Sequence, residues 1–154
     1  MSRVSRAAVL FIAQGAYSGK FPVGPGTAGT LVGVVLFLGI RNFSPLSYAA
    51  VCLLLCCIGT WAAGRAEDLL GRKDSPSIVI DEIAGYLISM FMVTSSWGFV
   101  LAGFLIFRVF DIVKPWPLNR LQDVHGGPGV MLDDIGAGVY ANVVLQIAAF
   151  LIAR

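Results

Sequence analysis

Three long apolar segments of this 154-residue chain begin or end at acidic residues, and this arrangement limits the folds open to it. Asp81 and Glu82 start the first segment, Asp111 lies near the end of the second, and Asp133 and Asp134 start the third. If the segments run back and forth as helices, all three acidic groups lie at the same end. Carboxylates that converge at the edge of an apolar layer favour a site for a hard cation such as Mg²⁺.

The composition predicts an integral membrane protein. Apolar residues make up 57% of the chain and charged residues only 13%, whereas about 25% of the residues are charged in an ordinary soluble protein. The alternative is a compact and very hydrophobic soluble helical bundle. A net charge of +2, with no basic stripe and no RNA-binding motif, argues against a nucleic-acid partner.

The N-terminus and the cysteines fit the same class of protein. The first residues have the basic start and short apolar stretch of a signal peptide, but we favour an interfacial helix with its arginines at headgroup level. The cysteines lie together in one apolar run, where small buried or lipid-facing side chains are expected and disulfides or metal ligands are not. They are Cys52, Cys56 and Cys57.

The pattern of apolar and polar residues predicts an all-α fold in one domain over residues 1–154. We expect a small polytopic membrane helical bundle, with about four to five apolar helices and an N-terminal interfacial helix. Thr27 is expected to cap the second helix. The expected helices cover residues 3–17, 27–40, 46–64, 78–94, 97–113 and 132–153. The expected loops include a polar stretch at 64–77 and an irregular one at 115–129.

Basic residues are unequally divided between the two ends of the expected bundle. Nine of the 11 Lys and Arg lie at the acidic end, and only Arg41 and Arg154 lie at the other. Because Lys and Arg are enriched in cytoplasmic loops, the acidic end should face the cytoplasm.

Each pair of acidic residues at a helix start has a purely structural explanation, because carboxylates there cap the helix and interact with its dipole. Asp111 differs, since it lies near a helix C-terminus, where the dipole disfavours an anion. Arg108 and Lys114 lie three residues to either side of it. They would serve as ion-pair partners of Asp111 or as clamps for a phosphate beside a metal.

Other polar residues are weaker candidates. His125, the only histidine, lies in the loop HGGPG, where it is able to act as a general acid or to contact phosphate. Glu67 is expected to be a solvent-exposed residue just after a helix, although its side chain could reach the acidic site. The motifs of cysteine-based, aspartyl-phosphate and histidine-based lipid phosphatases are missing, as is that of the CDP-alcohol phosphotransferases.

Four motifs, in this order and spacing, resemble the bacterial phosphatidylglycerophosphatase A family. They are PGTAGT at 25–30, SIVIDEIAG at 77–85, FRVFDIVKPWP at 107–117 and HGGPGVMLDDIGAGVYA at 125–141. The resemblance implies a magnesium-dependent, all-helical lipid phosphatase of the bacterial inner membrane. Together with the apolar segments and the charge asymmetry, it leads us to expect a multi-pass enzyme with its active site on the cytoplasmic side. Such an enzyme hydrolyses phosphatidylglycerophosphate to phosphatidylglycerol and phosphate in glycerophospholipid synthesis.

The resemblance and the residue types together give a set of expected roles. One or two Mg²⁺ would polarise the phosphoryl group and lower the pKa of a bound water. The nucleophile, water or a carboxylate, stays open. The expected metal ligands are Asp81, Glu82, Asp111, Asp133 and Asp134. The expected catalytic residues are Asp81, Asp111, Lys114, His125 and Asp134. The expected substrate-binding residues are Thr27, Arg108, Lys114 and His125.

Two other classes of protein fit parts of the pattern. Buried acidic residues would also serve a cation-binding membrane transporter or channel subunit, but these acids lie at one edge of the bundle and not near the middle of the spans. A phosphatidyltransferase would need to turn over a CDP-lipid. Release of phosphate from a phosphorylated glycerolipid separates the phosphatase from both.

Overall fold

The structure is a computed structural model that describes residues 3–73, 75–121 and 124–153, and within these residues the chain folds into helices and loops without β-strands. This confirms the all-α prediction. In chain order the elements are α1 (Arg3–Ala13), the 3-10 turn η1 (Ser18–Lys20), α2 (Pro25–Ile40), α3 (Pro45–Leu70), α4 (Ile80–Ser89), α5 (Trp97–Val113), α6 (Leu118–Leu121) and α7 (Gly127–Ile152).

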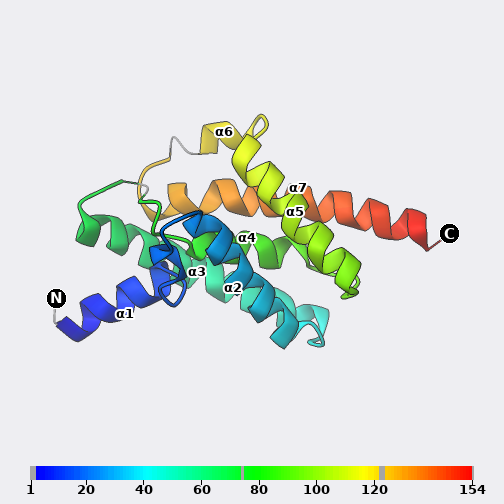
Figure 1. Ribbon diagram of the computed structural model, residues 1–154, viewed down its shortest axis with the longest axis horizontal. Coiled ribbons are helices and arrows are strands. Elements are labelled where there is room, and N and C mark those ends of the chain that lie inside the picture. Colours follow the sequence, from blue (N-terminus) through cyan, green and yellow to red (C-terminus); the bar gives the residue numbers. More distant parts are fainter. Residues whose placement is uncertain (1–2, 74, 122–123, 154) are drawn as a thin grey trace.

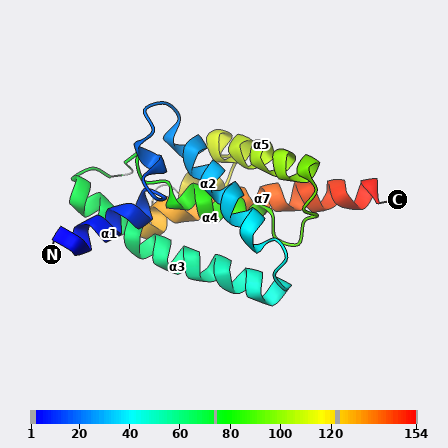
Figure 2. The same cartoon turned by 60° about the horizontal axis from the view of Figure 1, so that its bottom comes forward.

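The longest helices set the long axis of the molecule. α7 runs along most of its length, and α3 lies roughly antiparallel to it (Figure 1). The short α4 lies between the other helices and packs mainly against α7 and α2 (Figure 2). α1 extends from the end where α3 finishes and α7 starts, so the two termini lie at opposite ends of the molecule.

Local signals explain several helix ends. Ser44 precedes α3 and accepts a hydrogen bond from the backbone N–H of Ser47, and the helix ends at Gly71, which adopts a left-handed conformation. α5 has the predicted bounds, because Ser96 stands before it and Lys114 turns left-handed just before Pro115.

Several helices differ from the prediction in where they begin or end. α3 continues to Leu70 through residues that were expected to form a polar loop. α7 begins at Gly127, five residues earlier than expected, because Pro128 is accommodated in its first turn, where no N–H donor is needed. α1 ends at Ala13 and not at residue 17. Thr27 lies inside α2, whose N-cap residue is Gly24, so the capping role predicted for Thr27 is wrong.

α4 also ends earlier than expected, after only ten residues. The carbonyl groups of its last residue and of the turn that follows receive side-chain donors from α7. The Asn142 amide donates to the carbonyl groups of Ser89 at 2.9 Å and Phe91 at 2.8 Å, and Gln146 donates to Phe91 at 3.1 Å. These bonds satisfy backbone groups that would otherwise be buried without partners.

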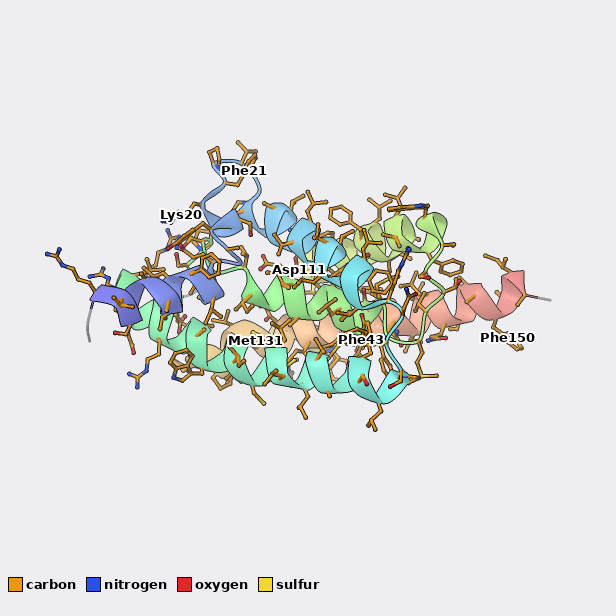
Figure 3. All side chains as sticks on the ribbon, turned by 90° about the horizontal axis from the view of Figure 1, so that it is seen from below. Lys20, Phe21, Phe43, Asp111, Met131 and Phe150 are labelled. Carbon is orange, nitrogen blue, oxygen red and sulfur yellow. The ribbon has the colours of Figure 1, made fainter. Side chains whose placement is uncertain are left out.

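Two helices of the described part of the chain, α3 and α7, are long and apolar enough to cross a membrane. α2 is apolar but shorter. Only 28% of the apolar window in α3 and 22% of that in α7 is buried inside the protein, so both helices differ from the core helix of a soluble bundle. Exposed apolar side chains on them include Leu53, Leu54, Val143, Ile147 and Phe150, the last at the end remote from α1 (Figure 3).

α4 and α7 approach each other closely at two glycines. A Cβ atom built on Gly138 would lie 2.4 Å from the carbonyl oxygen of Gly85, and one on Gly85 would lie 2.7 Å from the carbonyl oxygen of Asp134. Neither distance is compatible with a larger side chain. The two backbones are therefore in contact one helical turn beyond the acidic residues of each helix.

Candidate active site

Three carboxylates from α4 and α7 converge at this crossing. One oxygen each of Asp81, Glu82 and Asp134 lies within 4.8 Å of the others. Asp81 is 9% exposed and Asp134 only 2%. Because residues four apart share a helix face, the contact between Gly85 and Gly138 brings the acids one turn earlier on each helix together.

These acids do not cap their helices. The N-cap residue of α4, Val79, makes no side-chain cap bond, and Asp133 and Asp134 lie in the second turn of α7 and not at its start. In the described part of the chain, Asp81 Oδ1, Glu82 Oε2 and Asp134 Oδ2 are buried without a hydrogen-bond partner. Buried carboxylate oxygens without partners are costly, and a hard dication prefers such ligands. The residues present therefore fit a Mg²⁺ ion.

Two cations lie beside the three carboxylates. Arg108 Nη1 is 2.5 Å from Asp111 Oδ2 and 3.9 Å from Glu82 Oε1. Lys114 is hydrogen-bonded to Asp133 and lies 3.8 Å from Asp111 Oδ1. The ion pairs predicted for Asp111 with Arg108 and Lys114 are therefore present at the end of α5, and the bond from Lys114 to Asp133 links this end of α5 to α7.

Lys114 is held as a cation by its surroundings. Burial alone would lower its pKa, but the hydrogen bond to Asp133 and the charges of Asp133, Asp134 and Asp111 outweigh it, so the pKa is raised above its usual value. The left-handed backbone of Lys114, with φ of 44°, ends α5 at this position. A protonated amine therefore stays fixed beside the carboxylates at neutral pH.

The first turn of α2 completes this side of the cluster. A Cβ atom on Gly26 would lie 2.3 Å from Glu82 Oε1 and 3.1 Å from Arg108 Nη1, so a larger residue there would displace these two side chains. Figure 3 shows Asp111 in the middle of the molecule, and Lys20 and Phe21 on the loop that leads into α2. The N-terminal end of a helix favours anions, so α2 adds positive potential at the cluster.

The remaining predicted residues lie further out. Thr27 is exposed on the first turn of α2, next to Gly26 but not facing Glu82 as Gly26 does. His125 is exposed in the loop before α7. No described contact joins either side chain to the carboxylates, and their substrate-binding and catalytic roles stay predictions.

Sequence reasoning placed Glu67 after a helix, but it lies in the last turn of α3. There it lines a cavity of about 290 Å³ together with Lys73 and Asp133. Sequence reasoning missed Gly26 and Lys73. The glycine spacing of PGTAGT was the available signal for Gly26, whereas Lys73 in a polar stretch carried none.

Comparisons with known proteins identify the family of the chain. The family model for phosphatidylglycerophosphatase A matches residues 11–149. Phosphatidylglycerophosphatase A of Escherichia coli (strain K12) is 41% identical over 87% of this chain and 79% of its own length. The protein of the same name from Haemophilus influenzae is 38% identical over 87% of this chain and 84% of its own length.

A third relative carries a different name. A putative phosphatidylinositol-3-phosphatase of Bacteroides thetaiotaomicron is 36% identical over 99% of both chains. No solved structure matches the chain. From the family model and the identities over most of its length, the chain belongs to the phosphatidylglycerophosphatase A family.

Proposed function

We propose that this protein is a Mg²⁺-dependent lipid phosphatase that hydrolyses phosphatidylglycerophosphate to phosphatidylglycerol and inorganic phosphate. The observation that carries the proposal is the group of three buried carboxylate oxygens without partners, beside two fixed cations. Membership of the family supplies the substrate. The transporter alternative has no support in the comparisons.

Each residue of the cluster has a role in this proposal. Asp81, Glu82 and Asp134 hold the cation, and Asp111 and Asp133 complete the acidic shell. When bound, Mg²⁺ polarises the phosphoryl group and lowers the pKa of an attacking water.

The basic groups of the cluster face the substrate. Arg108 and Lys114 neutralise charge on the phosphoryl oxygens, and the N-terminal end of α2 adds backbone N–H groups. The bond between phosphorus and the glycerol oxygen breaks as water adds to phosphorus. His125 protonates the departing alkoxide. This role requires the loop before α7 to bring the His125 side chain towards the cluster.

The proposal also places the enzyme in the bacterial inner membrane with this site on the cytoplasmic side. The exposed apolar faces of α3 and α7 support membrane insertion, and the excess of Lys and Arg at the acidic end supports the orientation. The substrate is itself a membrane lipid, so a site at headgroup level reaches it without extracting the acyl chains.

Phosphate release from phosphatidylglycerophosphate in mixed micelles tests the proposal. The purified protein should release phosphate with Mg²⁺, lose this activity in EDTA, and regain it when Mg²⁺ is restored in excess. Full activity in the presence of chelator would exclude the metal site. An inactive but folded protein in Mg²⁺ would exclude the activity itself.

The name of the Bacteroides relative makes phosphatidylinositol 3-phosphate a second candidate substrate. Both lipids carry a phosphomonoester on a polyol headgroup, so the same carboxylates and cations would serve either. The two lipids should be compared at equal surface concentration. We expect a higher kcat/KM for phosphatidylglycerophosphate, and the reverse order would reassign the substrate.

A further inference from the structure

We propose that the cavity beside the carboxylate cluster binds the part of the headgroup that is not hydrolysed and makes the enzyme selective for it. In this proposal, which rests on the proposed function, Lys73 pairs with the phosphodiester of phosphatidylglycerophosphate. Glu67 accepts a hydrogen bond from its free glycerol hydroxyl. Both residues lie outside the cluster of carboxylates and cations that surrounds the phosphate to be removed.

The cavity is next to the cluster in the structure. It lies between the end of α3 and the start of α7 and has a volume of about 290 Å³. Asp133 belongs to both sites, because it lines the cavity while one of its oxygens holds Lys114. A ligand that extends from Lys114 past Asp133 therefore enters the cavity, where Glu67 and Lys73 are the other charged side chains of the described lining.

The start of α7, which contributes part of the cavity lining, is fixed by close packing. A Cβ atom on Gly127 would lie 1.9 Å from the carbonyl oxygen of Thr60, and one on Gly129 would lie 1.9 Å from the carbonyl oxygen of Val124. The start of α7 is thus held against α3 and against the loop before it. Helix N-termini favour anions, so the start of α7 supports Lys73 in binding a phosphodiester.

The size and chemistry of the cavity match a headgroup. At about 290 Å³ it is near the lower limit for ligand-binding clefts, so it is suited to a polar headgroup and not to acyl chains. Phosphatidylglycerophosphate carries an anionic phosphodiester and one free hydroxyl between its terminal phosphate and its diacylglycerol. Phosphatidic acid has the same kind of phosphomonoester but neither of these groups, so it cannot use Lys73 or Glu67.

The test compares two substrates in two variants. Lys73→Met keeps the aliphatic stem and removes the charge, and Glu67→Met keeps the length of the side chain and removes the acceptor oxygens. Each should lower kcat/KM for phosphatidylglycerophosphate about tenfold, mostly through KM, because a site that binds a substrate group disfavours an analogue without it. The rate with phosphatidic acid should change less than twofold, so the preference for phosphatidylglycerophosphate falls.

Arg72→Met and Asp68→Asn are the matched controls, since both residues are exposed neighbours that do not line the cavity. Both should behave as wild type, and all four variants should melt within a few degrees of it. A change of less than twofold with phosphatidylglycerophosphate in both Lys73→Met and Glu67→Met would overturn the inference. An equal loss with both lipids would also overturn it. A wild-type protein that releases no phosphate from phosphatidylglycerophosphate would instead contradict the proposed function.

Discussion

Asp134 and Asp111 belong to one acidic cluster but have different partners. Asp134 Oδ2 has no hydrogen-bond partner among the described residues, whereas Asp111 is held between Arg108 and Lys114. Asparagine has nearly the shape of aspartate but lacks the charge that binds a dication. Substitution at these two positions therefore separates a role in metal binding from a purely structural role.

We expect Asp134→Asn and Asp111→Asn each to lower the rate of phosphate release by at least about two orders of magnitude, the cost of losing a key electrostatic group. Asp134→Asn should also raise the Mg²⁺ concentration needed for half-maximal activity. The exposed Asp68→Asn serves as the control and should be silent. Folding must be followed by thermal melting, because loss of the Asp111 charge removes the nearest carboxylate of the half-buried Arg108. A well-folded Asp111→Asn protein with the normal rate would remove Asp111 from the site.

Most charged residues of the site were predictable, because a carboxylate beside a long apolar segment is costly to bury unless it has a polar partner or binds a cation. Gly26 was not, since a glycine carries no chemical signal and its importance lies in the space left for Glu82 and Arg108. The sequence analysis predicted a substrate-binding role for the neighbouring Thr27 instead, because its side chain carries a hydroxyl group. Successive residues on a helix point about 100° apart, so the two cannot face the same group.

At the scale of elements, the crossing of α4 and α7 sets the spacing of the carboxylates. We expect Gly138→Ala to force the two helices apart, since its Cβ would lie 2.4 Å from the carbonyl oxygen of Gly85. Activity should fall at least about tenfold, because small misplacements of reacting groups are costly. Phosphate release and thermal melting measure the two effects.

Gly39→Ala is the matched control for this experiment. Gly39 lies in α2 with nothing within 4 Å of its would-be Cβ. Alanine is a better helix former than glycine, so this variant should keep full activity and be as stable as wild type or slightly more stable. Equal activity in Gly138→Ala and Gly39→Ala would show that the helix crossing does not control the site.

The end of α4 gives a prediction about stability. In Asn142→Ala, the carbonyl groups of Ser89 and Phe91 lose their bonds to the Asn142 amide inside the bundle. We expect a cost of about 1–3 kcal/mol in the free energy of unfolding. Gln146→Ala removes one longer bond and should cost less. Chemical denaturation in detergent measures both, and an Asn142→Ala protein as stable as wild type would contradict this account.

The sequence predicts helix ends where the signal is local and misses them where it is not. Both ends of α5 follow from Ser96 and from Lys114 with Pro115. The end of α4 depends on Asn142, more than 50 residues away in the chain, which no local pattern reveals. The start of α7 was missed because Gly126, Pro128 and their glycine neighbours are typical of a loop, although proline is compatible with a first helical turn.

At the scale of the whole molecule, α3 and α7 run side by side in roughly opposite directions (Figure 1), and the acids of the cluster lie at the start of α4, near the end of α5 and in the second turn of α7. The composition and the positions of the charged residues predicted an apolar bundle with its acidic residues together, because both can be read directly from the sequence. They did not predict which helices lie next to each other. That choice depends on packing details such as the glycine contacts between α4 and α7.

The orientation in the membrane can be tested with single cysteines in a background without Cys52, Cys56 and Cys57. Arg72 follows α3 at the acidic end, and Asn42 lies in the turn between α2 and α3 at the other; both are exposed. In intact cells, a membrane-impermeant maleimide should label Asn42→Cys and leave Arg72→Cys unlabelled. Labelling of Arg72→Cys after lysis is the control, and its labelling in intact cells would reverse the orientation.

The unequal numbers of acidic and basic groups at the cluster have a consequence for handling the protein. Five carboxylates face two cations, Arg108 and Lys114, so repulsion between α4 and α7 is not fully balanced by the protein itself. A dication that binds only the folded state adds about 2.7 kcal/mol of stability at a hundredfold excess over its Kd. The melting temperature should therefore rise with Mg²⁺ concentration in the absence of any lipid substrate. Chelators in extraction buffers should shorten the lifetime of the purified enzyme, and a melting temperature unaffected by Mg²⁺ would contradict this.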